Sequence, residues 1–576
     1  MKHLLHNARI VMAILLLVPT GLQAQKLKKV RFNGLGRAYI SNTTIRGEIK
    51  TSDTTTVNRV TEGEFLLDLG IDIVPNDKNE IKATLRLRNE FGGFFGAGMS
   101  IEIRELYAKG IIANGLRYHI GDMDLAMTPY TLYLNEEAGR INLPEVFAPQ
   151  KEVIYYDQFY TDNHTRRMQG AKLDFGLSFA KIIDDLDFTA FLTRIRPTDF
   201  FTVPTRLLTG GTVSFQNRKH ARVRFHTLHV FDDLTSGNAN TGLRNPVYTA
   251  DAKIKLVEKD NWSLHLEGEG GVGRIVGKAD SITTFEKDDF FTDAGLTFQL
   301  PKKGISTTLN YRDVGPDFFS MAAQSKAVDF SRTKGLFHRI GNDQFVRAIS
   351  LFDLGRDRFL YTSQLQETLM PYDPRLSNTF PYGKATPNRR GVDLAFDYQQ
   401  PKEIADANLR IAYMSEIRGQ GTAELKNFLL TQLQGSMHFH KWKELKRNLS
   451  LTIGLQMERT QRGGNVVEQI DLTSLLFNAG IEAELFKKCD LLLGTQVLSA
   501  NGNEFRPILS QFNVIEDFPI SNYDDTEVLL GAGLRYRFKD DIYLTVQYHT
   551  FQFGQSLLPQ NDYNLNQVFV LYNMNF

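Results

Sequence analysis

The chain is poor in residues that support several common kinds of site. It has one Cys and two Trp in 576 residues, and 67 Lys+Arg nearly balance 66 Asp+Glu. A single Cys excludes a disulfide framework within the chain and any multi-Cys zinc or iron–sulfur site. The near-zero net charge gives no electrostatic reason to expect nucleic acid as a partner. We therefore expect no cofactor and no nucleic-acid partner.

Long apolar runs are missing as well. The run Ile10–Val18 is too short to cross a bilayer as a helix, and no later segment approaches the ~18 residues that a helical span needs. Yet 42% of the residues are hydrophobic and 11% are aromatic. Such a chain is either a large soluble β protein or one that disperses its hydrophobicity by alternation.

The first 24 residues predict a secretory signal peptide. Lys2 and Arg9 supply positive charge, Ile10–Val18 forms the apolar core, and Ala24 offers a small residue at the expected cleavage point. We expect the chain to leave the cytoplasm and residues 25–576 to form a single domain.

Strict two-residue alternation dominates the rest of the chain. Leu449, Leu451, Ile453, Leu455 and Met457, for example, alternate with small or polar residues. Neighbouring side chains of a strand point to opposite faces, so each such segment has one apolar and one polar face. Similar segments recur to residue 576, and helical periodicity is almost absent. The pattern predicts an all-β protein.

The connections between these segments alternate between short and long. Short ones are charged or turn-prone, such as Asn114-Gly115, the Lys441–Arg447 stretch and the turn that holds Cys489. The long ones are expected near 194–208, 231–246, 274–290, 313–388, 460–471, 499–525 and 553–564. Membrane β-barrels sort their connections in this way, with short periplasmic turns and long extracellular loops.

The chain ends on an alternating strand with a terminal Phe. Tyr572, Met574 and Phe576 lie at every second position. This resembles the C-terminal strand of Gram-negative outer-membrane β-barrels, and the resemblance covers essentially the whole chain after residue 25. It implies a location in the outer membrane, surrounding outer-membrane lipid, and recognition of Tyr572, Met574 and Phe576 by the barrel-insertion machinery.

Counting alternating segments predicts a transmembrane antiparallel β-barrel of about 22 strands, within a range of 18–24. TonB-dependent receptors have barrels of that size behind a globular plug of over a hundred residues. Here alternation begins near Val30, which leaves no room for such a plug. A porin-like channel fits the sequence better.

The inward face of such a barrel is expected to be charged and mostly basic. That pattern favours small polar or anionic solutes, unless acidic partners neutralise the wall. The candidate lumen-lining residues are Lys82, Arg86, Arg88, Arg222, Arg224, Lys253, Lys255, Glu267, Glu269, Arg410, Arg535 and Arg537.

Two segments, near 123–168 and 313–388, are too long for simple loops. Both are rich in aromatic residues, which argues against disorder. We expect each to fold into the lumen as a constriction, against an external partner, or as an extracellular cap.

No enzyme motif accompanies these features. His438 and His440 share a predicted strand face, but a metal site needs a third ligand. We expect a porin-like channel and not an enzyme. The alternative is a non-conducting barrel that serves as an accessory subunit of an envelope machine, such as a secretion system, bound to other envelope proteins.

Overall fold

The computed structural model describes residues 29–47, 59–90, 99–135, 141–158, 164–179, 183–217, 219–235, 240–279, 282–324, 337–339, 345–348, 365, 369, 372–505, 508–509, 515–559 and 562–576. The expected signal peptide, residues 1–24, lies outside these ranges.

One antiparallel sheet of 22 strands makes up most of the described chain. Its first half consists of β1 (Lys29–Gly47), β2 (Arg59–Asn76), β3 (Asn79–Glu90), β4 (Met99–Ile112), β5 (Leu116–Leu125), β6 (Arg166–Ser178), β7 (Asp185–Arg196), β8 (Thr205–Asn217), β9 (Ala221–Asp233), β10 (Thr241–Glu258) and β11 (Ser263–Ala279). Its second half consists of β12 (Ile282–Leu300), β13 (Ile305–Val314), β16 (Arg389–Gln399), β17 (Ala405–Ser415), β18 (Asn427–His438), β19 (Leu449–Arg462), β20 (Ile470–Phe486), β21 (Cys489–Phe505), β24 (Ile520–Lys539), β25 (Ile542–Gln555) and β26 (Tyr563–Asn575).

The remaining elements are short. Two small hairpins are β14–β15 (Phe337–Arg339 and Phe345–Ala348) and β22–β23 (Ile508–Leu509 and Ile515–Asp517). The helical pieces are η2 (Glu145–Phe147), α2 (Ala148–Gln158), η3 (Pro301–Lys303), η4 (Gly383–Ala385) and α4 (Phe439–Lys443). Among the described residues, no helix combines the length and the apolar content that crossing a membrane requires.

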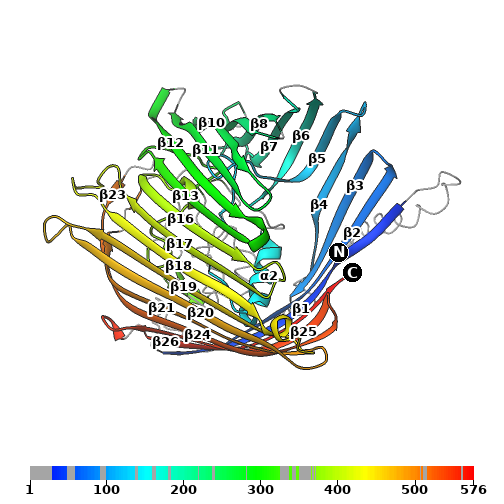
Figure 1. Ribbon diagram of the computed structural model, residues 1–576, viewed down its shortest axis with the longest axis vertical. Coiled ribbons are helices and arrows are strands. Elements are labelled where there is room, and N and C mark those ends of the chain that lie inside the picture. The colour runs from blue at the N-terminus through cyan, green and yellow to red at the C-terminus, as the bar shows by residue number, and fades with distance from the viewer. Residues whose placement is uncertain are drawn as a thin grey trace.

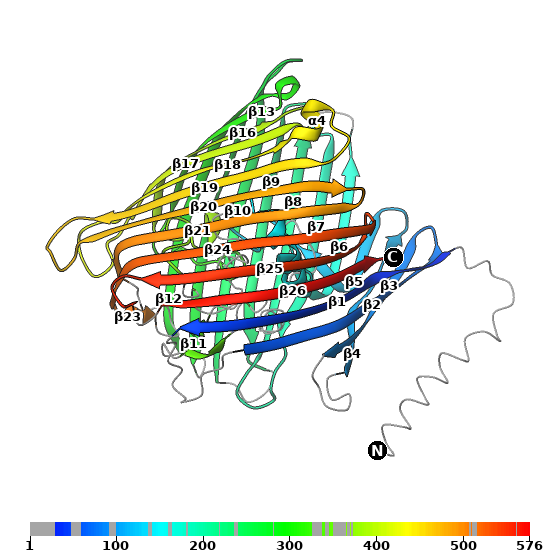
Figure 2. The same ribbon diagram turned by 90° about the horizontal axis from the view of Figure 1, so that it is seen from below.

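The sheet closes on itself into a barrel. Each strand pairs with its neighbour in the chain, and β26 pairs with β1 from Leu35–Asn575 to Gly47–Tyr563. Gly34 and Phe576 exchange two backbone hydrogen bonds of 2.9 and 3.1 Å, so the last residue belongs to this seam. Figure 2 shows β26 and β1 side by side. The predicted 22-stranded antiparallel barrel is confirmed.

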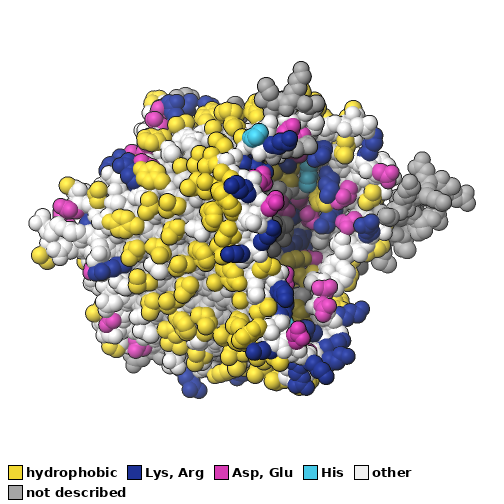
Figure 3. Space-filling view, in the orientation of Figure 1, with side chains coloured by type: hydrophobic (Ala, Val, Ile, Leu, Met, Phe, Trp, Pro, Cys, Tyr) yellow, Lys and Arg dark blue, Asp and Glu magenta, His cyan; other side chains and the backbone are white. Residues whose placement is uncertain are grey.

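The barrel is apolar outside and polar inside. Leu192 and Phe225 on the outer face are 50% and 52% exposed, whereas Arg312 and Asp490 on the inner face are fully buried. Figure 3 shows apolar side chains spread over the outer wall and charged side chains in the hollow beside it. A lipid environment makes such an outer surface favourable, and closure pairs the first strand of the sheet with the last. This is the architecture of a transmembrane β-barrel, and it confirms the resemblance at the level of the fold.

Several connections follow the predicted chemistry, and some do not. The expected hairpin turn at Asn114-Gly115 is present but is centred one residue earlier: Ala113 and Asn114 have φ values of 50° and 62°, and the Gly115 N–H donates to the Ile112 carbonyl at 3.2 Å. The expected long loop at 274–290 is wrong, because β11 continues to Ala279 and β12 begins at Ile282. Cys489 is the first residue of β21 and is buried, so it does not lie in a turn. The Lys441–Arg447 stretch overlaps the short helix α4.

The described parts of both long segments fold inside the barrel. Figure 1 shows α2 within the ring of strands. Four inward segments can be distinguished, and we name them by their residues: 127–135, 141–158, 315–324 and 372–388. Of the three arrangements expected from the sequence, folding into the lumen is the one that these residues adopt.

Candidate functional site

A row of wall glycines receives segment 141–158. Gly480 lies opposite Gly494, and Gly494 lies opposite Gly531, on the adjacent strands β20, β21 and β24. A Cβ atom on Gly480 would lie 2.6 Å from Pro144, and one on Gly531 would lie 2.7 Å from Phe147. The absent side chains therefore leave a shallow groove in the inner wall, and this segment occupies it.

Apolar and polar contacts extend this docking along the same row. Phe147 and Val146 pack with Leu492, Leu529 and Phe551 in one buried cluster. Gln150 then contacts the next two residues of the row, lying 3.1 Å from His549 and donating to Gln567 at 2.8 Å. Glu145 pairs with Arg535 at 2.5 Å, and Glu152 accepts from Tyr543 at 2.9 Å.

The far end of α2 meets a cluster of arginines. The ring of Tyr156 lies 3.7 Å from the Arg104 guanidinium, and the Tyr156 hydroxyl donates to Asp68. Arg86 donates two hydrogen bonds of 2.8 Å to the same carboxylate. Burial raises the pKa of Tyr156 above its usual value, so its hydroxyl stays protonated as a donor.

Segments 127–135 and 315–324 pack against β12 and β13. Tyr130 stacks on Phe291 with ring centroids 3.9 Å apart, and Phe318 meets both rings edge-on. The Tyr130 hydroxyl donates to Asp293 at 2.6 Å and accepts from Arg312 at 3.1 Å. This fully buried arrangement fills the part of the lumen beside these two strands.

Buried charge holds segment 372–388. Arg375 pairs with Asp525 at 2.9 Å and with Glu527 at 3.0 Å, both on β24. The backbone N–H groups of Asn378 and Thr379 donate to Glu458 at 2.7 and 3.1 Å. The carboxylates of β19 and β24 thus bind this segment. In segment 141–158, by contrast, apolar packing makes the main contact at Pro144 and Phe147.

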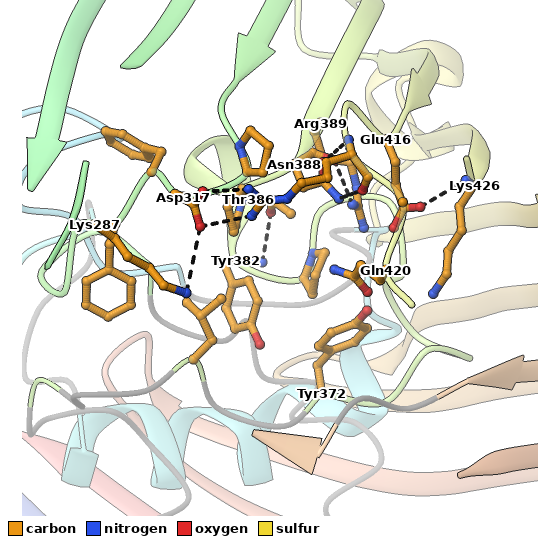
Figure 4. A pocket seen from close by; sticks show the side chains of 18 of the residues that line it. Lys287, Asp317, Tyr372, Tyr382, Thr386, Asn388, Arg389, Glu416, Gln420 and Lys426 are labelled. Atoms are coloured by element: carbon orange, nitrogen blue, oxygen red, sulfur yellow. Dashed lines mark hydrogen bonds and ion pairs between the residues drawn. The ribbon is translucent and has the colours of Figure 1, made fainter. Parts of the chain in front are cut away.

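A cavity of about 340 Å³ lies between segments 315–324 and 372–388, at the barrel end opposite the C-terminus. Arg389 at the start of β16 and residues of the loop after β17 complete the lining, and Figure 4 labels Arg389, Glu416 and Gln420 among them. Its aromatic lining includes Tyr372 and Tyr382, whose rings meet edge-on at 5.8 Å.

Charges of both signs surround this cavity. Arg418 donates to Asp317 at 2.7 and 2.9 Å and thereby lowers the pKa of that carboxyl, with Lys287 3.8 Å away. Burial raises the pKa of Glu416, which accepts from the backbone N–H of Lys426 at 3.0 Å. The cavity therefore offers aromatic surface together with both cations and carboxylates.

The candidate lumen-lining residues predicted from the sequence lie on the barrel strands, and acidic neighbours neutralise most of the basic ones. Arg535 reaches Glu145, Glu482 and Asp490, and Glu269 accepts from Thr128 of an inward segment. Among the described residues, Arg222 is the one candidate cation without an ion pair. The other pairs are Lys82–Glu105, Arg86–Asp68, Arg88–Glu64, Arg224–Asp251, Lys253–Glu267, Lys255–Glu258, Arg410–Asp393 and Arg537–Asp490.

The histidines assemble no metal centre among the described residues. His438 ends β18 and His440 lies in α4, with ring centroids 5.8 Å apart. No group of three His, Cys, Asp or Glu side chains with metal-binding spacing occurs in the described ranges.

Sequence reasoning missed the residues that hold the inward segments. The glycines at 480, 494 and 531 all occupy inward positions of alternating strands, which was a readable signal. Arg375 and Asp525 of β24 are 150 residues apart in the chain, and no local pattern connects them.

Comparisons with known proteins do not assign this chain to a family. No protein-family model and no curated protein sequence matches the chain. Solved structures that resemble it include the FrpB iron transporter from Neisseria meningitidis, with TM-score 0.45 and 10% identity over 96% of this chain and 83% of that one. Others are Pseudomonas aeruginosa OpdQ (0.36, 10%) and Acinetobacter baumannii OccAB2 (0.37, 8%), each over 96% of this chain and 100% of the other. With TM-scores below 0.5, these likenesses do not bear on function.

Proposed function

We propose that the protein is a channel of the Gram-negative outer membrane for small polar solutes. The observation that carries this proposal is a wide closed barrel with a charged inner wall and a cavity at one end. Residues 1–24 direct export, and Tyr572, Met574 and Phe576 at the closing strand present the signal for the barrel-insertion machinery.

The size and lining of the cavity support a small polar solute. About 340 Å³ lies in the range of small-molecule pockets, and such pockets combine aromatic surface with a few polar groups. The paired cations of the wall leave little unbalanced positive charge, so we expect a weaker anion preference than the sequence alone suggests. At the cavity, Arg418 and Lys287 share the Asp317 carboxylate, so the lining there is polar with little unbalanced positive charge.

The alternative is a non-conducting barrel that serves as an accessory subunit for other envelope proteins. One observation favours it: four inward segments occupy the lumen and are held by buried pairs such as Arg375–Asp525. In that case the cavity and the loops around it bind a partner and transport no solute.

Single-channel conductance of the purified, refolded protein in a planar bilayer separates the two functions. We expect small, stable open steps in KCl with slight ion selectivity. The Arg375→Ala variant should release segment 372–388. If the folded native protein and this variant both show no conductance, the channel function is contradicted and the accessory subunit is favoured. Heat-dependent gel migration checks that each sample is folded.

A further inference from the structure

The wall of the barrel is incomplete between β4 and β5. These strands pair from Ile112–Leu116 to Tyr107–Gly121, and there the pairing stops. Beyond that point β4 continues to Met99 paired only with β3, and β5 continues to Leu125 paired only with β6. Figure 1 shows the two strands diverging from the turn that joins them. We call the unpaired interval between residues 99–106 and 122–125 the lateral slot.

Local chemistry ends the pairing at this point. The backbone N–H of Leu106 donates to the Asp122 side chain at 2.6 Å instead of to a strand carbonyl. Gly121 has φ +108°, and a Cβ there would lie 2.3 Å from the Leu106 carbonyl oxygen. A bulge at Arg104 then shifts the register of β4. Bulges and side-chain capping blunt an edge against further strand pairing, so this edge is unsuited to receive another strand.

The outer rim of the lateral slot is apolar along β4. Met99, Ile101 and Ile103 are 63%, 66% and 65% exposed, more than Leu192 on the fully paired wall at 50%. They face the lipid side, because Ile101 and Ile103 lie opposite the outward residues Leu87 and Leu85. The unpaired edge therefore presents extra apolar surface to the bilayer.

The inner rim is charged, because the bulge turns two consecutive side chains inward. Arg104 donates to Asp68 at 2.9 Å and to the Tyr156 carbonyl at 2.5 Å. Glu105 pairs at 3.0 Å with Arg167 of β6, which is in the outward register of that strand, so this ion pair passes through the slot from its lumen side to its lipid side. Arg167 also binds Asp124 of β5 at 2.6 Å.

We propose that the lateral slot is an entry site for an acyl-chain amphiphile from the membrane. Its tail lies against Met99, Ile101 and Ile103, and its polar end meets Arg104 and Arg167. An apolar outer rim, a charged inner rim and a blunted edge together fit such a molecule better than a docking strand. This site is independent of solute passage along the barrel axis.

Fluorescence quenching by brominated phosphatidylcholine tests the proposal. The two native tryptophans are first replaced, Trp262→Phe and Trp442→Phe, and Tyr156→Trp then places a reporter at the inner rim. The matched control is Tyr130→Trp, which lies inside the lumen against Phe291 on the fully paired β12. We expect brominated vesicles to quench the reporter at 156 and to leave the one at 130 unchanged, relative to unbrominated vesicles.

Equal quenching at both positions, or none at 156, overturns the proposal. If the reporter variants fail to fold, a photo-cross-linking amino acid in place of Glu102 at the slot is compared with one in place of Lys253 on the paired wall. A lipid adduct at 102 but not at 253 supports the site, and the absence of an adduct at 102 overturns it. A silent planar bilayer contradicts the channel function without affecting either readout.

Discussion

Segments 141–158 and 372–388 occupy the same lumen but are held by different forces. The first fits a groove of wall glycines through Pro144 and Phe147 and adds an apolar cluster. The second places Arg375 between two wall carboxylates and directs backbone N–H groups at Glu458. The first segment is held mainly by shape at Pro144 and Phe147, with polar contacts at Glu145 and Tyr156, and the second is held mainly by buried charge.

The difference determines which segment can be released by a small chemical change. Truncating an apolar side chain in a close-packed groove costs energy in proportion to the void that remains. A buried ion pair that loses one partner leaves an uncompensated charge, which costs more than the pair itself contributes. We therefore infer that segment 372–388 is the more readily switched of the two.

The largest effect is expected from Arg375→Ala. Asp525 and Glu527 are 4% and 5% exposed, so the change leaves two buried carboxylates without their cation. We expect a loss of about 3–5 kcal/mol in the free energy of unfolding in detergent micelles. The control is Arg459→Ala, which breaks an exposed pair with Asp471 and should cost about 1 kcal/mol or less. Equal losses of unfolding free energy in the two variants would contradict the inference that buried charge holds segment 372–388.

A somewhat smaller effect is expected from Phe147→Ala, which tests the shape-held segment. Phe147 is fully buried against Leu492, Leu529 and Phe551. We expect a loss of about 3 kcal/mol, at the lower end for such a truncation, because the neighbouring side chains can relax into the void. Denaturant titration measures the loss, and Phe147→Leu should recover most of it. A loss that depends strongly on ionic strength would show that charge, and not shape, holds this segment.

Tyr156→Phe should have a smaller effect again. It removes the hydroxyl that donates to Asp68 but keeps the ring beside Arg104. Asp68 still has Arg86 and Arg104, so we expect a loss of about 1–2 kcal/mol. The same titration measures it, with Tyr536→Phe on the exposed outer face as the control. A loss as large as that of Arg375→Ala would mean that buried charge is also the main force that holds α2 in the lumen.

The sequence predicts the strands of the barrel wall far better than the inward segments that fill the lumen. Alternation such as that of Leu449–Met457 encodes strand faces directly, and Phe576 marks the strand that closes the barrel. The placement of the inward segments depends on contacts such as Arg375–Asp525, which no local sequence pattern reveals. Inward cations such as Arg535 are visible in the sequence, but their acidic partners lie on other strands and segments. The consecutive charges Arg104 and Glu105 interrupt an alternating strand, and this break was the available signal of the bulge.

The smallest expected effect is a pH dependence beside the charge-held segment. Glu416 is 3% exposed near Arg389, whose guanidinium donates to the carbonyls of Asn378 and Thr379. Burial raises the pKa of Glu416 above its usual value of 4.5, so the folded protein binds this proton more tightly than the unfolded chain does.

The contribution of Glu416 to stability is therefore fully present below pH 4.5 and is lost as the pH rises through the raised pKa. Glu416→Gln mimics the protonated state at every pH and keeps an acceptor for the Lys426 N–H. We expect this variant to unfold at a slightly higher temperature than the native protein at pH 7, and the two midpoints to converge below pH 4.5. Glu468→Gln, on an exposed loop, should show no such convergence. The opposite result is an unfolding temperature of the native protein that falls relative to that of Glu416→Gln as the solution is acidified. It would mean that the folded protein needs the charged carboxylate of Glu416, and that this charge also helps to hold segment 372–388.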